Sequence, residues 1–473
     1  MSQRRRLLLS GFIMNTPNHI LGGGWRRADG GQAGFQELKL WTDLARKLEE
    51  AKFDALFLAD VVGLYGDDDG GWANHVRRGL QVPSHDPLVL ASALAAVTDK
   101  LGLAFTSSVI QAHPYQLARQ LGTLDHLSGG RAAWNVVTSI LPNAHRNFGA
   151  KGLPAHDDRY EWAEEYVDVA YRLWEGSWDR DAVVVDRENG IYADPAKVHK
   201  IHTEGERYSV EGPHLVAPSP QGTPFIFQAG SSPRGSRFAA THAEATFYFA
   251  PNPEYVARKV AALREAEVQA GRARGSVKAF AGLHVIVGST EAEVARKVAE
   301  FDADVDLDSI IAHIGGGFGV DLGGLPHDTT LGDVQTEGGQ GVLEAVFASA
   351  PGKNPTIADV ARYRARGQLI SGTPEQVADQ LEVWQDAGMD GVNLINFTLP
   401  GTYVDFIDGA LPELRRRGLA QSEYGAGATL RERLNDAVGP EAALIAADHP
   451  AARYRGAFAE HSAAATERPR ARA

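Results

Sequence analysis

Apolar residues in this chain fall into short continuous runs that alternate with longer stretches of helical periodicity. Leu7–Met14 is the first run, and after it apolar residues recur every three or four positions, at Phe35, Leu38, Trp41, Leu44, Leu48 and Ala51. A run of this length fits a strand buried on both faces, and the periodic stretch fits a helix that covers it. The same alternation predicts further strands at Ala55–Asp60, Leu101–Val109, Arg131–Thr138, Pro224–Ala229, Ala245–Ala250, Ala279–Val287 and Gly391–Phe397.

Helix start and stop signals separate most of these strands. Asp86-Pro87 and Asn252-Pro253 each place a capping residue before a proline, which is typical of a helix N-terminus. Thr290 with Glu293, and Thr373 with Gln376, have the spacing of capping boxes. Gly129-Gly130 ends a helix that begins at Pro114, because glycine adopts the positive φ of a helix C-terminus without strain.

Two stretches and the C-terminal tail interrupt the alternation. Residues 178–220 hold short strand patterns around polar turns, and residues 304–369 are rich in glycine and low in periodicity, so both are predicted insertions. The second insertion is also a candidate lid, because glycine permits closure. The tail, residues 435–473, is rich in Ala, Glu and Arg and shows no clear apolar face. It is predicted to be a surface arm, partly disordered.

Eight strand–helix units in one chain indicate a parallel sheet with right-handed crossovers. We therefore predict an α/β fold, a (β/α)8 TIM barrel formed as a single domain by residues 1–434, with the excess length in the two insertions. An open, doubly wound sheet is the alternative. In either case chemistry is expected where the strands end.

Composition narrows the classes of function. The chain has 473 residues, 47 Lys and Arg against 60 Asp and Glu, a formal net charge of −13 and no cysteine. Disulfides, thiolate catalysis and Cys-ligated metals are therefore excluded, and binding to nucleic acid or an anionic membrane is disfavoured. Arg4–Arg6 before Leu7–Met14 imitates a signal peptide, but Gly11 interrupts the run and no cleavage site follows. We expect a cytoplasmic enzyme.

Several polar residues lie at predicted strand ends, where a ligand would bind. Asp60 closes an apolar strand and needs hydrogen-bond donors if it is buried, although it would equally serve as an N-cap of the next loop. Thr106 could bond to the backbone, as buried threonines commonly do. Asn135 could contact the edge of a heterocycle or brace a loop.

A second group of residues has the pattern of a phosphate site. Ser231-Ser232-Pro233-Arg234-Gly235 follows a predicted strand and opens a helix, so backbone N–H groups, hydroxyls and a guanidinium meet there. A plain capping turn is the alternative. His156 and Tyr160 lie four residues apart, on one face of a helix start, where they could also be ordinary cap residues.

Aromatic residues at strand ends are candidates for a substrate wall, although such residues more often belong to the core. They are Phe12, Trp25, Phe57, Phe247 and Phe249. The glycine clusters at 315–319 and 338–341 do not follow a strand and open a helix, so they are not dinucleotide fingerprints. His199 and His202 have no carboxylate at ligand spacing, and we predict no metal.

Several motifs have amino-acid sequences that are specific enough to indicate a family. They are Gly11-Phe12, Phe57–Asp60, Gly130–Ser139 with Asn147-Phe148-Gly149, Ala193–His199 and Gln228–Gly235. Together they resemble the component-A monooxygenases of the bacterial luciferase-like superfamily. That group contains nitrilotriacetate monooxygenase, dibenzothiophene-sulfone monooxygenase and the pristinamycin synthase oxygenase. The resemblance runs from about Leu8 to Leu434.

The resemblance implies a site for flavin mononucleotide (FMN). In the enzymes that this chain resembles, FMN is held at the positions of Asp60, Thr106, His156, Tyr160 and Ser231, the last followed here by Ser232. Asp60 and Thr106 would lie beside the isoalloxazine ring, with Asn135 and Val137 near it. His156, Tyr160 and Ser231 would hold the phosphate end. A histidine of the related sulfone monooxygenase points to His313, with Phe12 and Phe57, as the substrate pocket; a surface histidine is the alternative.

The resemblance also implies an activity. Reduced FMN from a separate NAD(P)H:flavin reductase would react with O₂ to oxygenate a small organic substrate, with cleavage of a C–S or C–N bond. A homodimer or homotetramer is expected. Three alternatives stay open: a deazaflavin (F420)-dependent oxidoreductase of the same superfamily, a barrel hydrolase with paired carboxylates, and a non-catalytic flavin-binding protein.

Overall fold

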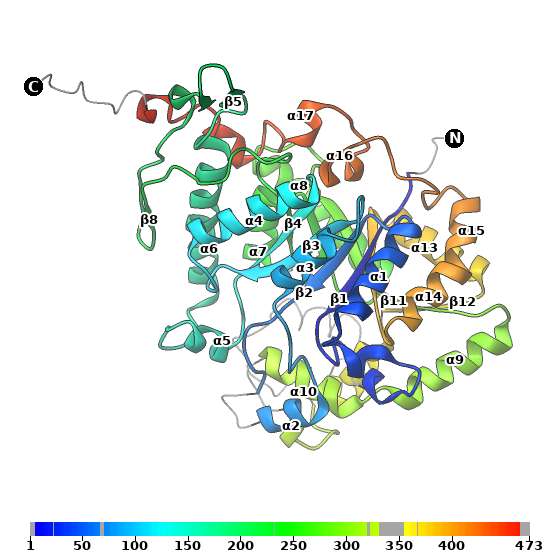
Figure 1. Ribbon diagram of the computed structural model, residues 1–473. Coiled ribbons are helices and arrows are strands. Elements are labelled where there is room, and N and C mark those ends of the chain that lie inside the picture. Colours follow the sequence, from blue (N-terminus) through cyan, green and yellow to red (C-terminus); the bar gives the residue numbers. More distant parts are fainter. Residues whose placement is uncertain are drawn as a thin grey trace, which may run out of the picture.

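Eight parallel strands close into a barrel in the computed structural model (Figure 1), which describes residues 5–21, 23–66, 71–230, 232–318, 322–330, 354–366 and 368–463. Each strand pairs with the next, β10 pairs with β11, and β13 returns to β1. The predicted closed barrel is therefore confirmed, and the open sheet is wrong. The strands are β1 (Leu8–Met14), β2 (Ala55–Ala59), β3 (Gly102–Ser108), β4 (Ala132–Val137), β9 (Phe225–Gln228), β10 (Ala245–Tyr248), β11 (Lys278–Val287) and β13 (Gly391–Ile395).

Helices cover the outside of the barrel, and their caps follow the sequence. Asp86 accepts hydrogen bonds from Leu88 N and Val89 N, and Thr373 forms a complete capping box with Gln376. Thr290 caps its helix, but the expected box with Glu293 does not form, because Glu293 accepts from Ser289 instead. The covering helices are α1 (Leu38–Glu50), α3 (Pro87–Ala95), α4 (Pro114–Ser128), α6 (His156–Tyr171), α7 (Pro233–His242), α8 (Pro253–Gln269), α9 (Glu291–Asp304), α13 (Pro374–Asp386) and α15 (Leu411–Arg416).

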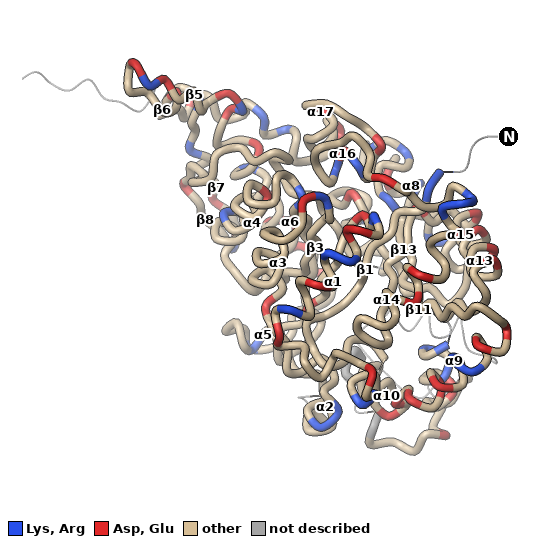
Figure 2. Tube along the Cα trace, turned by 45° about the vertical axis from the view of Figure 1, so that its right-hand side comes forward, with Lys and Arg blue, Asp and Glu red and all other residues tan. Residues whose placement is uncertain are grey.

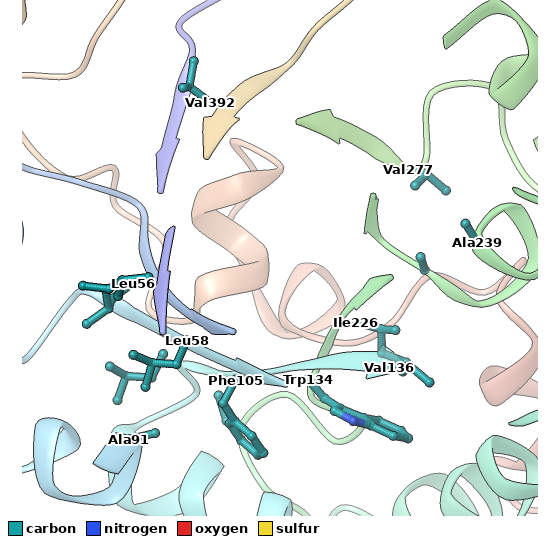
Figure 3. Packing of buried hydrophobic residues seen from close by; sticks show 14 of the residues in the cluster. Leu56, Leu58, Ala91, Phe105, Trp134, Val136, Ile226, Ala239, Val277 and Val392 are labelled. Atoms are coloured by element: carbon teal, nitrogen blue, oxygen red, sulfur yellow. The ribbon is translucent and has the colours of Figure 1, made fainter. Parts of the chain in front are cut away.

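Two apolar clusters fill the molecule. The larger one lies between the strands and the helices, where Leu58, Phe105 and Trp134 pack outward from neighbouring strands (Figure 3). The second fills the barrel itself, where the rings of Phe57 and Phe227 lie 5.2 Å apart and Phe227 lies 5.8 Å from Phe280. Because successive residues of a strand point to opposite faces, one set of strands serves both clusters.

The two insertions differ in character. The first carries two small hairpins, β5 (Val183–Asp186) with β6 (Ile191–Ala193) and β7 (Thr203–Glu204) with β8 (Ser209–Val210). The second was expected to be low in periodicity, but it contains α10 (Leu307–Phe318), α12 (Ile357–Arg366) and β12 (Leu369–Gly372). The expectation missed α10 because its buried residues are consecutive rather than periodic, with Ile310, Ile311 and Ile314 in the barrel cluster. It also overlooked α12, whose buried residues Ile357, Val360, Ala361 and Ala365 do follow helical spacing. Residues 331–353 lie outside the described part of the chain.

The C-terminal segment is packed against the barrel rather than forming the expected surface arm. Residues 435–463 form α17 (Pro440–Ala443) and short 3-10 turns, and Ile445, Ala451 and Tyr454 are buried in the outer cluster. Arg455 also pairs with Glu175 at 2.7 Å. Sequence periodicity could not reveal this packing, because turns and irregular backbone set no regular spacing of apolar residues. Residues 464–473 lie outside the described chain.

Helix α16 (Leu430–Leu434) closes the end of the barrel where the strands begin. Leu430 and Leu434 enter the inner cluster, and Leu430 N donates to Gly130 O. In Figure 1, α16 lies at the opposite end of the barrel from α10 and from α2 (Trp72–Arg78). The carboxyl ends of the strands therefore face α2 and α10.

The surface carries both signs of charge without segregation. Figure 2 shows acidic and basic positions interspersed over the outer helices. Among the described residues, no helix is both long enough and apolar enough to cross a bilayer.

We expect the buried Arg431–Glu244 ion pair to be a main determinant of stability. Arg431 is 2% exposed, its Nε and Nη2 atoms donate to Glu244 at 2.6 and 2.9 Å, and it also donates to three backbone carbonyls. Arg431→Met should leave the buried Glu244 without its cationic partner, and lower the free energy of unfolding by about 3–5 kcal/mol. Urea titration followed by circular dichroism measures this.

The exposed pair Arg274–Glu265 supplies the control, because Arg274→Met should leave the urea midpoint unchanged. Adding Glu244→Gln to Arg431→Met should restore part of the loss. Equal midpoints for Arg431→Met and Arg274→Met would contradict this role of the buried pair.

Candidate functional site

A cavity of about 330 Å³ lies at the carboxyl ends of the strands, within the size range of small-ligand sites. Its walls come from four strand ends, from the loops after β1, β2 and β4, and from the insertion helices α10 and α12. The lining residues are Phe12, Met14, His19, Ile20, Ala59, Asp60, Val61, Tyr65, Gln81, residues 136–140, Tyr160, Gln228, Ala229, Phe249, His313, Ile314 and Arg364.

Asp60 follows β2 and lines the cavity. Burial raises the pKa of its carboxyl group to about 7, and the nearby Asp86 adds to the increase. The backbone N–H of Val61 and the side chain of Gln111 oppose it by hydrogen bonding to the charged form. Asp60 therefore exchanges a proton near neutral pH, which an ordinary carboxylate does not.

Thr106 and Asn135 lie next to each other on adjacent strands, below the cavity lining. Asn135 Nδ2 donates to Thr106 Oγ1 at 2.9 Å, and both side chains are almost fully buried. The Oδ1 atom of Asn135 has no partner among the described residues. Since a buried unpaired acceptor is costly, this atom is a candidate ligand contact.

The loop after β4 reaches the cavity in a strained conformation. Ser139 has a φ of 53°, which is uncommon for a residue other than glycine. The buried Arg159 donates to Ser139 O at 2.6 Å, and Ser139 Oγ donates to Ser108 Oγ at 2.9 Å. These bonds fix Val137 and Ile140 in the wall.

The first turn of α7 forms a polar recess beside Tyr160. Ser232 caps this helix by accepting from Gly235 N at 3.0 Å. A Cβ atom on Gly235 would lie 2.5 Å from the Tyr160 hydroxyl oxygen, so only glycine allows this approach. Burial raises the pKa of Tyr160, and its hydrogen bonds with Ser232 and Gln228 oppose the rise.

Two charged or titratable side chains border this recess. The guanidinium of Arg234 lies 5.7 Å from the Tyr160 ring centre and pairs with Glu164 at 3.2 Å. The ring of His156 lies 5.3 Å from that of Tyr160, and its Nδ1 atom contacts Asp157 at 2.8 Å. Ser231 lies outside the described residues.

Another part of the cavity wall is formed by aromatic and histidine side chains. Gln81 Nε2 donates to His19 O at 2.8 Å and lies 3.2 Å from His313 Nε2. An amide NH₂ can only donate, so His313 Nε2 is the acceptor and the ring is neutral. Burial lowers the pKa of His313 to about 3, which agrees with that state. Tyr65 packs edge-on against His313, with ring centres 4.9 Å apart.

The structure brings most of the candidate residues to one place. Asp60, Val137 and Tyr160 line the cavity with Phe12 and His313, and Ser232 lies beside Tyr160. Phe57 does not reach the lining, because it lies in the ring layer beneath Phe12, with ring centres 5.1 Å apart. Phe249 lines the wall, whereas Phe247 belongs to the same inner layer as Phe57.

Sequence reasoning missed the polar lining residues that lie outside the recognised motifs. They are His19, Tyr65, Gln81 and Arg364, and none lies in a predicted strand or helix start. His19 follows a strand closely enough to have been a candidate. Tyr65, Gln81 and Arg364 come from loops and an insertion, for which the chain carries no positional signal.

A closed parallel barrel with a strained loop, a helix N-terminus and perturbed titratable groups around one cavity defines an α/β-barrel enzyme with a cofactor-sized site. Comparison with known proteins gives the family. The family model described as luciferase-like monooxygenase matches residues 19–391. The chain belongs to that family and is a flavin-dependent monooxygenase.

The similarity to named relatives extends over whole chains. The long-chain alkane monooxygenase of Geobacillus thermodenitrificans is 43% identical, over 95% of this chain and 98% of its own. The dimethyl-sulfide monooxygenase of Hyphomicrobium sulfonivorans is 41% identical, over 96% and 95%. The crystal structure from H. sulfonivorans aligns with a TM-score of 0.90, covering 98% of this chain and 99% of that one. A riboflavin lyase solved with modified FMN and riboflavin aligns at 0.86 with 36% identity, covering 95% of this chain and 100% of that one.

Asp60 should make the ligand-free protein less stable as the pH rises. Its carboxyl group titrates near 7 in the folded chain and near 3.8 when unfolded, so between these values only the folded form holds the proton. The corresponding stability is therefore lost as the pH rises through that window. Asp60→Asn should gain stability over the wild type between about pH 4 and 7, by on the order of 2 kcal/mol, and the gain should level off above that range.

Thermal unfolding of both proteins over that pH range measures the difference. Asp43→Asn, at an exposed position on α1, is the control and should show no such pH-dependent gain. A constant difference between Asp60→Asn and the wild type at every pH would show that Asp60 is not perturbed.

Proposed function

We propose that this chain is the oxygenating component of a two-component system. It takes reduced FMN from a separate NAD(P)H:flavin reductase and uses O₂ to oxygenate a small organic substrate, with cleavage of a C–S or C–N bond. The observation that carries the proposal is one cavity that combines polar groups, Asp60 and Gln228 with the start of α7 beside Tyr160, with the aromatic Phe12 and Phe249 and with His313. Relatives named for dimethyl sulfide and dibenzothiophene sulfone support the choice of bond. We expect a homodimer or homotetramer.

The residues present fit FMN by their donors and acceptors. The N-terminus of α7, with Ser232 and Arg234, has the backbone dipole and positive charge that a phosphate needs. Asn135 Oδ1 and Gln228 Oε1 are buried, have no partners within the described chain, and suit the hydrogen-bonding edge of a flavin ring. Asp60 and Thr106 would lie beside the ring. Tyr160, His156 and Ser231 would hold the phosphate end.

The protein itself supplies orientation, a dry environment and one titratable group. When bound, reduced flavin supplies the electrons with which O₂ is activated. Phe12, Phe249 and Ile314 exclude water from the space beside it. Gln81 holds His313 neutral, so that its Nδ1–H is available to a substrate acceptor. Asp60 can hold or release a proton near neutral pH in the cavity wall at the end of β2.

An anaerobic titration with reduced and with oxidised FMN tests the proposal directly. We expect markedly tighter binding of the reduced form, because a component fed by a reductase must capture it before it meets O₂. Flavin absorbance after admission of air should then show a transient species rather than immediate oxidation. Equal, weak binding of both forms with immediate oxidation would overturn the proposal and favour a deazaflavin-dependent reductase or a non-catalytic binder.

The phosphate end can be located by comparing FMN with riboflavin. Arg234→Gln should weaken FMN binding by roughly tenfold, because one charge-assisted contact to the phosphate is lost, and should leave riboflavin binding unchanged. Fluorescence titration of each flavin measures both affinities. Arg237→Gln, three residues further along α7 and exposed, is the matched control and should change neither. An equal effect of Arg234→Gln on the affinities for both flavins would show that the phosphate does not bind at α7.

A further inference from the structure

Arg364 is a cation in the cavity wall that has no acidic partner among the described residues. It lies on α12, and its guanidinium carbon is 5.0 Å from the ring centre of Phe249. Its Nε atom is buried and makes no hydrogen bond, and none of the carboxylates in the described ranges forms an ion pair with it. On the same helix, the exposed Arg362 and Arg366 have Asp359 and Asp302 as partners.

The buried arginines of this chain, Arg159 among them, each donate to at least one acceptor of the protein, although Nε of Arg159 and of Arg272 has no partner among the described residues. Arg131 donates to Ser128 O at 2.6 Å and Thr98 O at 2.6 Å, and Arg272 donates to Ala240 O at 3.1 Å and to Ala243 O. Arg431 has Glu244. Within the part of the chain that the structure describes, Arg364 has only the face of Phe249. Burial lowers the pKa of its guanidinium to about 10, so it still carries its charge at neutral pH.

Three neutral imidazoles surround this cation. Burial lowers the pKa of His19, His284 and His313 to about 3 each, and the charge of Arg364 contributes to all three shifts. His19 and His313 line the cavity with Arg364, whereas His284 is 2% exposed, does not line it and interacts with the Ile395 backbone. Nδ1 of His19 is buried and has no hydrogen-bond partner in the described ranges. Neutral imidazoles offer N–H donors without adding a negative charge. The region thus combines one positive charge with unused donors, which is the chemistry of an oxyanion site.

The energetic cost of this arrangement points to a ligand. A buried charge without a counter-ion destabilises a protein, and it is tolerated where a partner arrives from outside. The phosphate of a flavin is not that partner on the proposed orientation, because Arg234 at the start of α7 lies against Tyr160, whereas Arg364 lies against Phe249.

We propose that the substrate of this enzyme is an organic anion whose carboxylate or sulfonate group binds Arg364. Its apolar body would lie along Phe12, Phe249 and Ile314. The role as substrate rests on the proposed oxygenase function, but the selectivity for an anion is a property of the cavity alone.

Isothermal titration of the full-length protein with a matched pair of probes tests the selectivity without flavin. The probes are 4-phenylbutanoate and 4-phenylbutan-1-ol, which differ in the anionic group. We expect the acid to bind the wild type at least tenfold more tightly than the alcohol. Arg364→Gln should lower the affinity for the acid by roughly 10- to 100-fold and leave the affinity for the alcohol unchanged. Arg364→Lys should keep part of the preference, because it retains the charge without the planar donor geometry.

Two further variants test whether a different cation binds the acid. Arg362→Gln removes an exposed cation from the same helix, and Arg234→Gln removes the cation at α7; both should retain the preference for the acid. Arg364→Gln should also raise the melting temperature of the ligand-free protein, because a buried uncompensated charge is removed. Loss of the preference in Arg234→Gln but not in Arg364→Gln would place the anion at α7 and overturn the proposal.

Equal affinities for acid and alcohol in the wild type would also overturn it. That result would leave the flavin titration unaffected, so failure of the anion site and failure of the oxygenase function are distinguishable. Where the preference holds, 4-phenylbutane-1-sulfonate is compared with 4-phenylbutanoate. The probe that binds more tightly shows whether sulfonates or carboxylates are the class of substrate to test.

Discussion

Closure of the barrel is the constraint on which the rest of this structure depends. Once eight strands close, every second residue points into a space that only side chains can fill, and nothing but the two ends stays accessible. Phe57, Phe225, Phe227 and Phe280 fill the middle, and α16 closes the end where the strands begin. A cavity can therefore form only above the phenylalanine layer, at the carboxyl ends of the strands.

The same closure explains how much of the fold could be predicted from the sequence. All eight barrel strands are visible as short apolar runs, because a strand buried on both faces needs apolar residues at every position, as Leu56, Phe57 and Leu58 show. The insertions follow other rules. Helix α10 buries consecutive residues from Ser309 to Ala312, so its buried positions are not confined to one face, and residues 435–463 pack through turns; neither produces the periodic signal on which such predictions rest.

The candidate site was predictable to the extent that it is built on barrel strands. Asp60, Thr106 and Asn135 stand out because they are polar at the ends of apolar runs, and Ser232 because it precedes a proline at a helix start. Phe57 was predicted to line the cavity but lies one layer of side chains below it, because periodicity predicts which face of a strand a residue occupies but not its position along the barrel axis. Tyr65, Gln81 and Arg364 reach the cavity from loops and an insertion, and only the folded chain reveals that they meet.

The buried charges of this protein divide along the barrel axis. At the end closed by α16, Arg431 has Glu244 and backbone carbonyls as partners, so its burial serves the fold. At the open end, Asp60 lacks a cation and Arg364 lacks an anion among the residues that the structure describes, and both pKa values move toward the neutral form. Mutual pairing would have relieved both costs, yet neither side chain pairs with the other. Two uncompensated groups of opposite charge in one cavity wall are what a site requires when ligands complete each of them, which the flavin and an anionic substrate would do.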